Sequence, residues 1–174
     1  MIMHIRFRFF MASLAAALVF GLPAQATQAT KIQSNRDWTV YTFTEHGNKV
    51  CYIASQPVKD EGKYTKRGDI FTFITHRPAA DERGVISVLS GYTYKKGSAV
   101  NLDIDDTSYI LFTQGDRAWA PDAETDASLV SAMRKGKKMV VKGTSSRGTQ
   151  TTDTYSLMGF TKSLEMIDKE CGIK

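Results

Sequence analysis

The sequence predicts an all-β fold, a mainly antiparallel β-sandwich or barrel-like sandwich with two short helices, one near the C-terminus. Apolar and polar residues alternate over most segments, as from Val100 to Asp105, and this period of two is typical of half-buried strands. Turn-forming clusters such as Glu45–Asn48 separate these segments at short intervals. Only two segments have the apolar spacing of a helix. Because we find no internal repeat or low-complexity linker, we predict one domain, residues 37–174.

Residues 1–26 have the pattern of a cleaved secretory signal peptide. Two arginines precede an apolar run from Phe9 to Leu22, and Ala24-Gln25-Ala26 places small residues where a signal peptidase reads them. The alternative is a membrane anchor, but the uninterrupted apolar run is shorter than the about 20 residues that span a bilayer. We therefore expect cleavage after Ala26 and a flexible lead over residues 27–36. The mature protein is expected to be periplasmic, secreted or associated with the cell surface, and not to span the membrane.

The mature domain has nine predicted strands. The first two form a hairpin over residues 37–56, which ends at Pro57. The charged segments Lys59–Gly68 and Arg77–Gly84 are predicted to be loops. The remaining strands are rich in β-branched and aromatic residues, and we expect them at Asp69–His76, Val85–Tyr94, Val100–Asp105, Tyr109–Thr113, Arg117–Ala120, Lys138–Gly143 and Thr149–Leu157.

Two short amphipathic helices complete the predicted fold. The first covers Ala127–Lys135, with Asp126 as its N-cap and Gly136 as its stop signal. The second covers Lys162–Glu170 and follows Thr161 as its N-cap. Each helix has a single apolar stripe, which in the second consists of Phe160, Leu164, Ile167 and Cys171.

The mature chain has two cysteines, Cys51 and Cys171. In an exported protein the simplest arrangement is one disulfide. Closing this loop of about 120 residues would contribute on the order of 4–5 kcal/mol at most. The alternative is two free thiols, one of them a nucleophile. Because the expected compartment is oxidising and no Cys–His signature surrounds either residue, we predict the disulfide.

The charge of the mature chain argues against nucleic acid as a partner. The full sequence has a formal charge of +5, and removing two arginines with the signal peptide lowers it to +3, a value typical of soluble proteins. Aromatic residues are not interleaved with the basic clusters in the manner of a single-strand-binding platform. The densest basic cluster could still meet an anionic lipid headgroup or a polysaccharide. With polar residues of a predicted hairpin, it forms a candidate interaction surface: Arg134, Lys135, Lys137, Lys138, Arg147, Thr149 and Thr151.

The chain contains no complete catalytic, cofactor or metal motif. Gly143–Gly148 has the glycine spacing of a P-loop, but Thr149 and Gln150 stand where Lys and Ser/Thr are required, so we interpret it as a β-turn. The acidic residues between Asn101 and Asp106 lack the glycine and the terminal acid of an EF-hand loop. We therefore predict no cofactor, no metal site and no catalytic residues.

We expect no catalytic role for the histidines and no ligand-binding role for the aromatic residues. His46 and His76 are the two histidines of the mature chain, too few for a zinc site, and no serine lies in a nucleophile elbow. We predict surface roles for both. Trp38, Trp119 and the aromatic residues of the strands are expected in the core, because large aromatics dominate small β cores.

Several segments occur in an order and spacing that resemble a known family: Asp37–Val40, Cys51–Pro57, Val100–Asp105, Leu129–Gly136, Gly143–Thr149 and Asp153–Phe160. Over about Asp37 to Cys171 the chain resembles the invasion-associated locus B family, exported proteins of Gram-negative bacteria. Members often have a further central cysteine pair, which Phe112–Ala123 lacks here. The resemblance implies a periplasmic or surface-associated β protein, linked in some pathogens to host-cell entry. It carries over no catalytic residue.

Three functional hypotheses follow. The first is an exported, non-enzymatic protein that binds another macromolecule or an envelope component, with a role in host-cell invasion implied by the resemblance. The second is a β-barrel with an interior pocket for a small apolar ligand. The third is an enzyme with a dispersed site around His76, Arg77 and Asp81. The export signal, the β pattern, the predicted disulfide and the lack of an assembled active site favour the first.

Overall fold

The structure is a computed structural model that describes residues 28–173, so the predicted signal peptide lies outside the described residues. The chain forms eleven strands, two α-helices and one 3-10 turn: β1 (Thr30–Asn35), β2 (Trp38–Glu45), β3 (Asn48–Ser55), β4 (Lys59–Gly62), β5 (Phe71–Arg77), η1 (Pro78–Ala80), β6 (Glu82–Leu89), β7 (Ala99–Ile104), β8 (Thr107–Gln114), β9 (Arg117–Trp119), α1 (Ala123–Lys135), β10 (Lys138–Thr144), β11 (Gln150–Ser156) and α2 (Phe160–Glu170). All eleven strands belong to one antiparallel sheet in the order β1-β2-β3-β5-β6-β9-β8-β7-β10-β11-β4.

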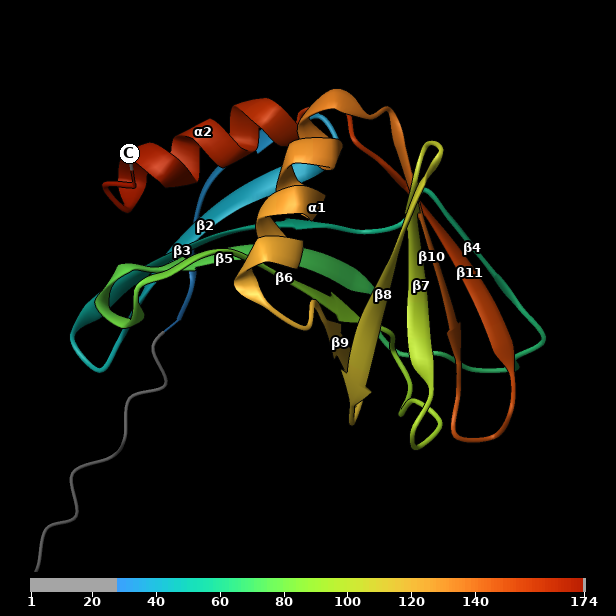
Figure 1. Ribbon diagram of the computed structural model, residues 1–174. Coiled ribbons are helices and arrows are strands. Elements are labelled where there is room, and N and C mark those ends of the chain that lie inside the picture. The colour runs from blue at the N-terminus through green and yellow to red at the C-terminus, as the bar shows by residue number, and fades with distance from the viewer. Residues whose placement is uncertain (1–27, 174) are drawn as a thin grey trace, which may run out of the picture.

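The sheet bends into two lobes (Figure 1). β2, β3, β5 and β6 run beneath α2, whereas β8, β7, β10, β11 and β4 form the second lobe. α1 stands near the bend, where it contacts β6 and α2. We call the side of the sheet that carries Val40, Ile53, Ile74 and Ile86 the buried face, because these residues have no exposed surface and the helices pack on this side. The other side is the open face.

A continuous core fills the buried face of both lobes. It joins Trp38 of β2 and Tyr155 of β11 with the first residue of α2, Phe160, and all three are completely buried. The Trp38 and Phe160 rings meet edge to face at 5.0 Å, and the Trp38 indole N–H donates to the Ser156 carbonyl at 3.0 Å. The indole therefore buries its apolar area and satisfies its donor at the same time.

The predicted fold class is confirmed, since the chain is mainly antiparallel β with two helices, one at its C-terminal end. All nine predicted strands are present, and two further strands lie where we expected irregular chain. β1 occupies much of the predicted flexible lead, residues 27–36, and β4 begins the predicted loop Lys59–Gly68. Both are edge strands with side chains that are almost all exposed, so their polar sequences hide no apolar face that a pattern could reveal.

Both helices begin earlier than predicted. Asp122, not Asp126, caps α1, and its carboxylate accepts a hydrogen bond from the Thr125 N–H at 2.7 Å. Asp126 instead points into the protein and accepts the Ile86 N–H at 2.8 Å. α2 follows Gly159, not Thr161. Gly159 has a φ of 89°, and a Cβ there would lie 1.9 Å from the Asn35 carbonyl oxygen, so the close approach of the chain to β1 requires glycine.

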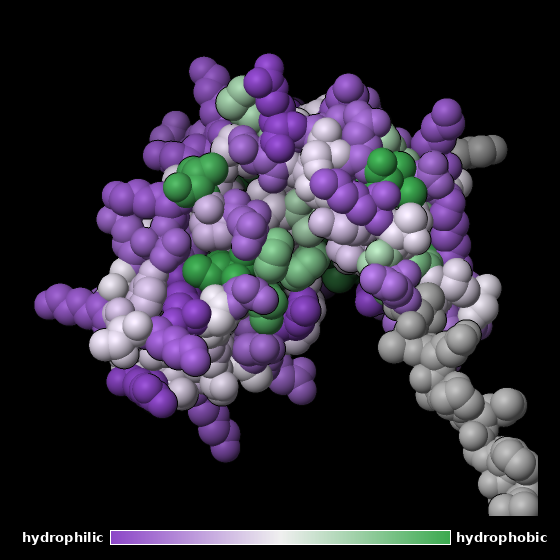
Figure 2. Space-filling view, turned by 180° about the vertical axis from the view of Figure 1, so that it is seen from behind, coloured by the Kyte–Doolittle hydropathy of each residue, from purple (hydrophilic) through white to green (hydrophobic). Residues whose placement is uncertain are grey.

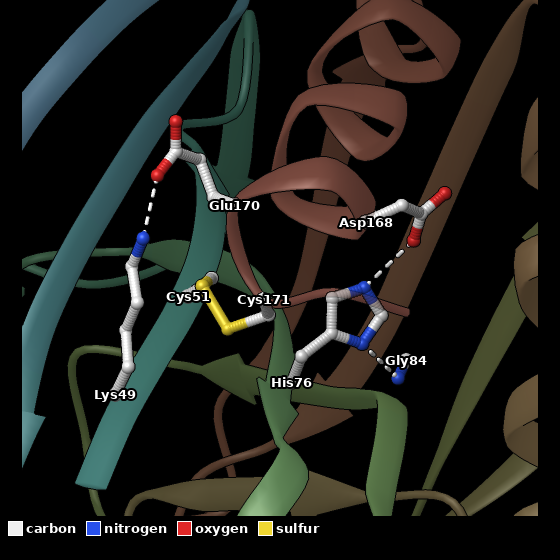
Figure 3. Close-up of a disulfide and its surroundings, with 7 residues drawn as sticks. All are labelled: Lys49, Cys51, His76, Gly84, Asp168, Glu170 and Cys171. Atoms are coloured by element: carbon white, nitrogen blue, oxygen red, sulfur yellow. Dashed lines mark hydrogen bonds and ion pairs between the residues drawn. A yellow bond between two sulfur atoms is a disulfide. The ribbon is translucent and has the colours of Figure 1, made fainter. Parts of the chain in front are cut away.

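The predicted disulfide between Cys51 and Cys171 is confirmed, so the alternative of two free thiols was wrong (Figure 3). Cys51 lies on the buried face of β3, and Cys171 directly follows α2. Their Cα atoms are 6.0 Å apart, within the usual range for a disulfide. The bridge fastens the end of α2 to the sheet.

Candidate functional site

The open face carries a group of partly exposed aromatic side chains. Alternation along the strands turns Tyr41 and Phe43 of β2 away from the buried Trp38 and Val40. The same alternation on neighbouring strands completes the group, which we call the aromatic cleft: Tyr41, Phe43, Tyr52, Phe71, Phe73, Phe112 and Trp119. The rings therefore come from five strands of both lobes.

Contacts between rings hold the aromatic cleft together. Tyr41 and Tyr52 are directly opposite in the sheet and stack at 5.0 Å, and Tyr52 lies 6.0 Å from Phe73. Phe112 stacks on Trp119 at 5.7 Å, and about half of its surface, 48%, is exposed. A cavity of about 480 Å³ opens between Phe43, Tyr52, Phe73 and Trp119. Figure 2, seen from behind, shows apolar residues gathered around a hollow between the two lobes.

Two arginines border the aromatic cleft, and only one of them has an acidic partner within residues 28–173. Arg77 makes ion pairs with Glu45 and Glu82. The Arg117 guanidinium lies 5.2 Å from the centre of the Phe73 ring, a cation–π contact, and makes no ion pair within residues 28–173. The cleft thus combines apolar rings with one uncompensated positive charge.

The aromatic cleft corrects our prediction that the aromatic strand residues belong to the core. The prediction holds for Trp38 and Tyr155, which are fully buried, and for Tyr94, which is 5% exposed. Trp119 and the other rings of the cleft lie on the open face. The reason is that β2, β3 and β5 carry large apolar side chains on both faces, and only one face packs on the helices.

A second cavity, of about 610 Å³, lies at the far end of the second lobe. The chain from β4 to β5 forms one side of it, and the turn between β10 and β11 forms another. We call it the polar pocket, and its lining is dominated by hydroxyl-bearing and basic side chains: Lys63, Tyr64, Thr65, Lys66, Arg67, Tyr92, Thr93, Ser145, Ser146, Arg147, Thr149 and Thr151.

A buried ion pair supports the polar pocket. The Arg67 guanidinium makes two 2.6 Å hydrogen bonds to the Asp153 carboxylate, and both side chains are less than 5% exposed. Its Nε donates to the Ser90 carbonyl at 2.7 Å, and the Tyr64 and Tyr92 rings flank it at 5.5 and 5.0 Å. Burial alone would lower the pKa of Arg67, but the Asp153 carboxylate raises it, so the guanidinium stays charged. Arg67 is therefore fixed in place by partners on three sides.

The structure divides the predicted interaction surface into two parts. Arg147, Thr149 and Thr151 line the polar pocket. Lys135, Lys137 and Lys138 lie at the end of α1 and the start of β10, at the opposite end of the β10–β11 hairpin, as the pairing of Lys138 with Ser156 and of Thr144 with Gln150 shows. Arg134, beside them, pairs with Asp168 of α2.

His76 does not lie on the surface as predicted; it is 3% exposed (Figure 3). Its Nδ1 accepts the Gly84 N–H at 2.9 Å, so the proton of the neutral ring lies on Nε2, which donates to Asp168 at 2.9 Å. Burial lowers the pKa of His76, although the Asp168 carboxylate opposes this effect. His46 is exposed in a turn, as predicted.

The residues of the hypothesised dispersed active site do not converge. His76 points into the core, and Arg77, the next residue of β5, lies on the open face with Glu45 and Glu82. Asp81 is exposed and pairs with Arg83. Within residues 28–173 no cluster of three or more His, Cys, Asp or Glu side chains could hold a metal ion. In the same part of the chain, no helix has the length and apolar character needed to cross a membrane.

These features define a β-domain built on one bent sheet, fastened by a disulfide and open on an aromatic face. The family model described as Invasion associated locus B (IalB) protein matches residues 38–168, and the chain belongs to this family. A solved relative is the crystal structure of invasion associated protein b from Bartonella henselae, with 18% sequence identity and a TM-score of 0.57. The match covers 81% of this chain and 96% of that one, and it shows a shared fold. No curated protein matches this chain.

Proposed function

We propose that this protein is an exported, non-enzymatic binding protein of the cell envelope, and that it holds a protein partner in the aromatic cleft. The observation that carries the proposal is the group of seven partly exposed aromatic rings on the open face. Contiguous apolar surface of this kind is unfavourable in water unless a partner covers it. Tyr, Trp, Phe and Arg are also the residues most enriched where protein interfaces bind tightly.

The charge of the aromatic cleft specifies the partner further. Arg117 lies among the rings without an ion pair in the described part of the chain, and a partner that buried it would need to supply a carboxylate. We therefore expect a protein segment with apolar side chains and at least one Asp or Glu. The cavity of about 480 Å³ has room for a few such side chains.

The disulfide supports the export of this protein, because such bonds persist in oxidising compartments. The pattern of residues 1–26 supports it independently. These two observations support our proposal that the protein acts in the periplasm or at the cell surface. Since the solved relative is an invasion associated protein, a contribution to host-cell invasion is part of the proposal.

The other two hypotheses have less support. A small apolar ligand inside the sheet would need the space that Trp38, Tyr155 and Phe160 fill. An enzyme would need reactive groups to converge, and His76, Arg77 and Asp81 point to different environments.

The test is photo-crosslinking in intact cells, with the crosslinker placed at Thr75 on the open face beside the cleft. We expect a crosslinked protein whose attachment site lies beside an acidic residue, and Phe112→Ala should reduce its yield by about tenfold. Met158→Ala is the matched control, because Met158 is 57% exposed and Phe112 is 48% exposed. Equal yields from both variants would contradict the proposal, as would turnover of a substrate by the purified protein.

A further inference from the structure

The polar pocket carries positive charge that the protein does not neutralise. Lys63, Lys66 and Arg147 line it, are exposed, and make no ion pair within residues 28–173. No Asp or Glu is part of the lining. Asp153, beneath the pocket, is already paired with Arg67, and the Asp60 carboxylate accepts the Tyr64 hydroxyl. Three free cationic side chains thus converge on one concavity, where their mutual repulsion favours an anion.

The walls of the polar pocket offer many hydrogen-bonding groups that do not carry charge. Thr65, Thr93, Ser146 and Thr149 contribute hydroxyls, and the Tyr92 hydroxyl lies 2.6 Å from that of Thr151. The tyrosine rings beside Arg67 add flat apolar surface. A ligand that fits this lining carries several hydroxyl groups on a compact body, as a sugar does.

Backbone packing keeps the polar pocket open. Gly68 and Gly91 cross at its base, and the Gly68 N–H donates to the Gly91 carbonyl at 2.9 Å. Gly91 has a φ of 74°, and a Cβ there would lie 2.5 Å from the Gly68 carbonyl oxygen, so no side chain can stand at this crossing. The fixed Arg67 holds the adjoining segment. The cavity is therefore part of the fold, as ligand sites usually are.

We propose that the polar pocket binds a phosphate monoester carried on a sugar, either as a soluble sugar phosphate or as the phosphorylated headgroup of a lipid. A phosphate monoester carries nearly two negative charges and three strong acceptor oxygens, which suits three cations better than a singly charged carboxylate does. The volume of about 610 Å³ exceeds what a lone phosphate ion fills and lies within the range of small-molecule sites.

The first test compares ligands by isothermal titration calorimetry at about 0.15 M ionic strength, where non-specific attraction is screened. Glucose 6-phosphate should bind at least about tenfold more tightly than glucuronate or glucose. To separate the two sources, the same protein is mixed with vesicles that contain phosphatidylinositol 4-phosphate, whose phosphate monoester lies on a polyhydroxylated ring, or only phosphatidylcholine. A lower dissociation constant for the phosphatidylinositol 4-phosphate vesicles than for glucose 6-phosphate assigns the lipid source, and the reverse assigns the soluble ligand. Binding to neither, up to about 1 mM, overturns the proposal, as does equal affinity for glucuronate.

The second test localises the site with two variants of equal charge. The triple variant Lys63→Ala, Lys66→Ala, Arg147→Ala should lose at least about tenfold in affinity. The control Lys135→Ala, Lys137→Ala, Lys138→Ala removes the same charge from the opposite end of the β10–β11 hairpin and should change affinity less than about threefold. All six side chains are exposed, so both variants should fold. Equal losses would show general electrostatic attraction and overturn the site. Phe112→Ala should leave this affinity unchanged, which separates the polar pocket from the aromatic cleft.

Discussion

The two faces of the sheet are built from the same strands but use their side chains in opposite ways. On the buried face, the charged groups have defined partners, as with Arg67 and Asp153 or His76 and Asp168, whereas the buried hydroxyls of Thr72 and Tyr155 have no hydrogen-bond partner among the described residues. On the open face, large aromatic rings contact one another and remain partly exposed. We infer that substitutions on the buried face mainly change the free energy of unfolding, whereas those on the open face mainly change binding. Substitutions on both faces test this difference, and those with the largest expected effect on stability come first.

The largest effect is expected for Arg67→Ala, which leaves the Asp153 carboxylate buried without its partner. We expect a loss of about 3–5 kcal/mol in the free energy of unfolding, measured in urea. Arg117→Ala is the control, because this arginine lies on the open face over Phe73, and it should cost less than about 1 kcal/mol. Similar losses in the free energy of unfolding for the two arginine variants would contradict the proposed difference between the faces.

The double variant Cys51→Ser, Cys171→Ser should lose about 2–4 kcal/mol in the free energy of unfolding, because the bridge closes a long loop. The wild-type protein unfolded in the presence of a reductant should show the same midpoint as this variant. Its affinity for the sugar phosphate should not change, because the bridge lies beside α2 and not at the polar pocket. An unchanged midpoint would mean that packing alone holds α2.

Two buried groups should give the unfolding free energy opposite dependences on pH. Burial raises the pKa of Asp126 to about 6. The buried, ionised carboxylate therefore lowers the free energy of unfolding above that pH, and this cost disappears as the pH falls toward 4 and the carboxyl becomes protonated. Asp126→Asn should therefore stabilise the protein at pH 8, by about 1–3 kcal/mol, and have little effect at pH 4. A variant that is less stable than the wild type at pH 8 would show that the carboxylate is needed at the Ile86 N–H.

His76 acts in the other direction. Burial lowers its pKa below the ordinary 6.5. The contribution of the neutral ring to the free energy of unfolding is therefore complete above pH 6.5 and is lost as the pH falls through the folded-state pKa. His76→Gln should flatten this loss, because a neutral amide can still pair with Gly84 and Asp168. Urea unfolding of both proteins at pH 7.5 and 5 measures the difference. An equal loss in the variant would assign the pH dependence to other groups.

The smallest effect on stability is expected on the open face. Phe112 is about half exposed, so Phe112→Ala should change the free energy of unfolding by less than about 1 kcal/mol. The same substitution should remove most crosslinking to the partner. A large loss of stability would show that the ring is a structural element, not a contact for a partner.

Alternation allowed most of the fold to be predicted, because a strand with one buried face shows a period of two. It could not locate β1 and β4, whose exposed side chains carry no such period. It also could not show which face of β2, β3 and β5 the helices cover, and this choice decides whether Trp119 or Trp38 is buried. The only signal for the aromatic cleft was the presence of large rings at alternate positions on both sides of a strand. The pairing of Arg67 with Asp153, 86 residues apart, depends on tertiary structure alone.

The disulfide has a consequence for cleavage of the chain by a protease. Cys51 and Cys171 enclose β4 to β11 and α2 in one covalent ring, which also contains the exposed turn at Ser146–Gly148 and the segment at Lys63–Lys66. A protease that cuts once at either place leaves two pieces that are still joined. On a denaturing gel the cut protein should therefore run as one species without a reductant and as two pieces with one. A single nick at either of these two places would thus leave every strand covalently attached to the molecule.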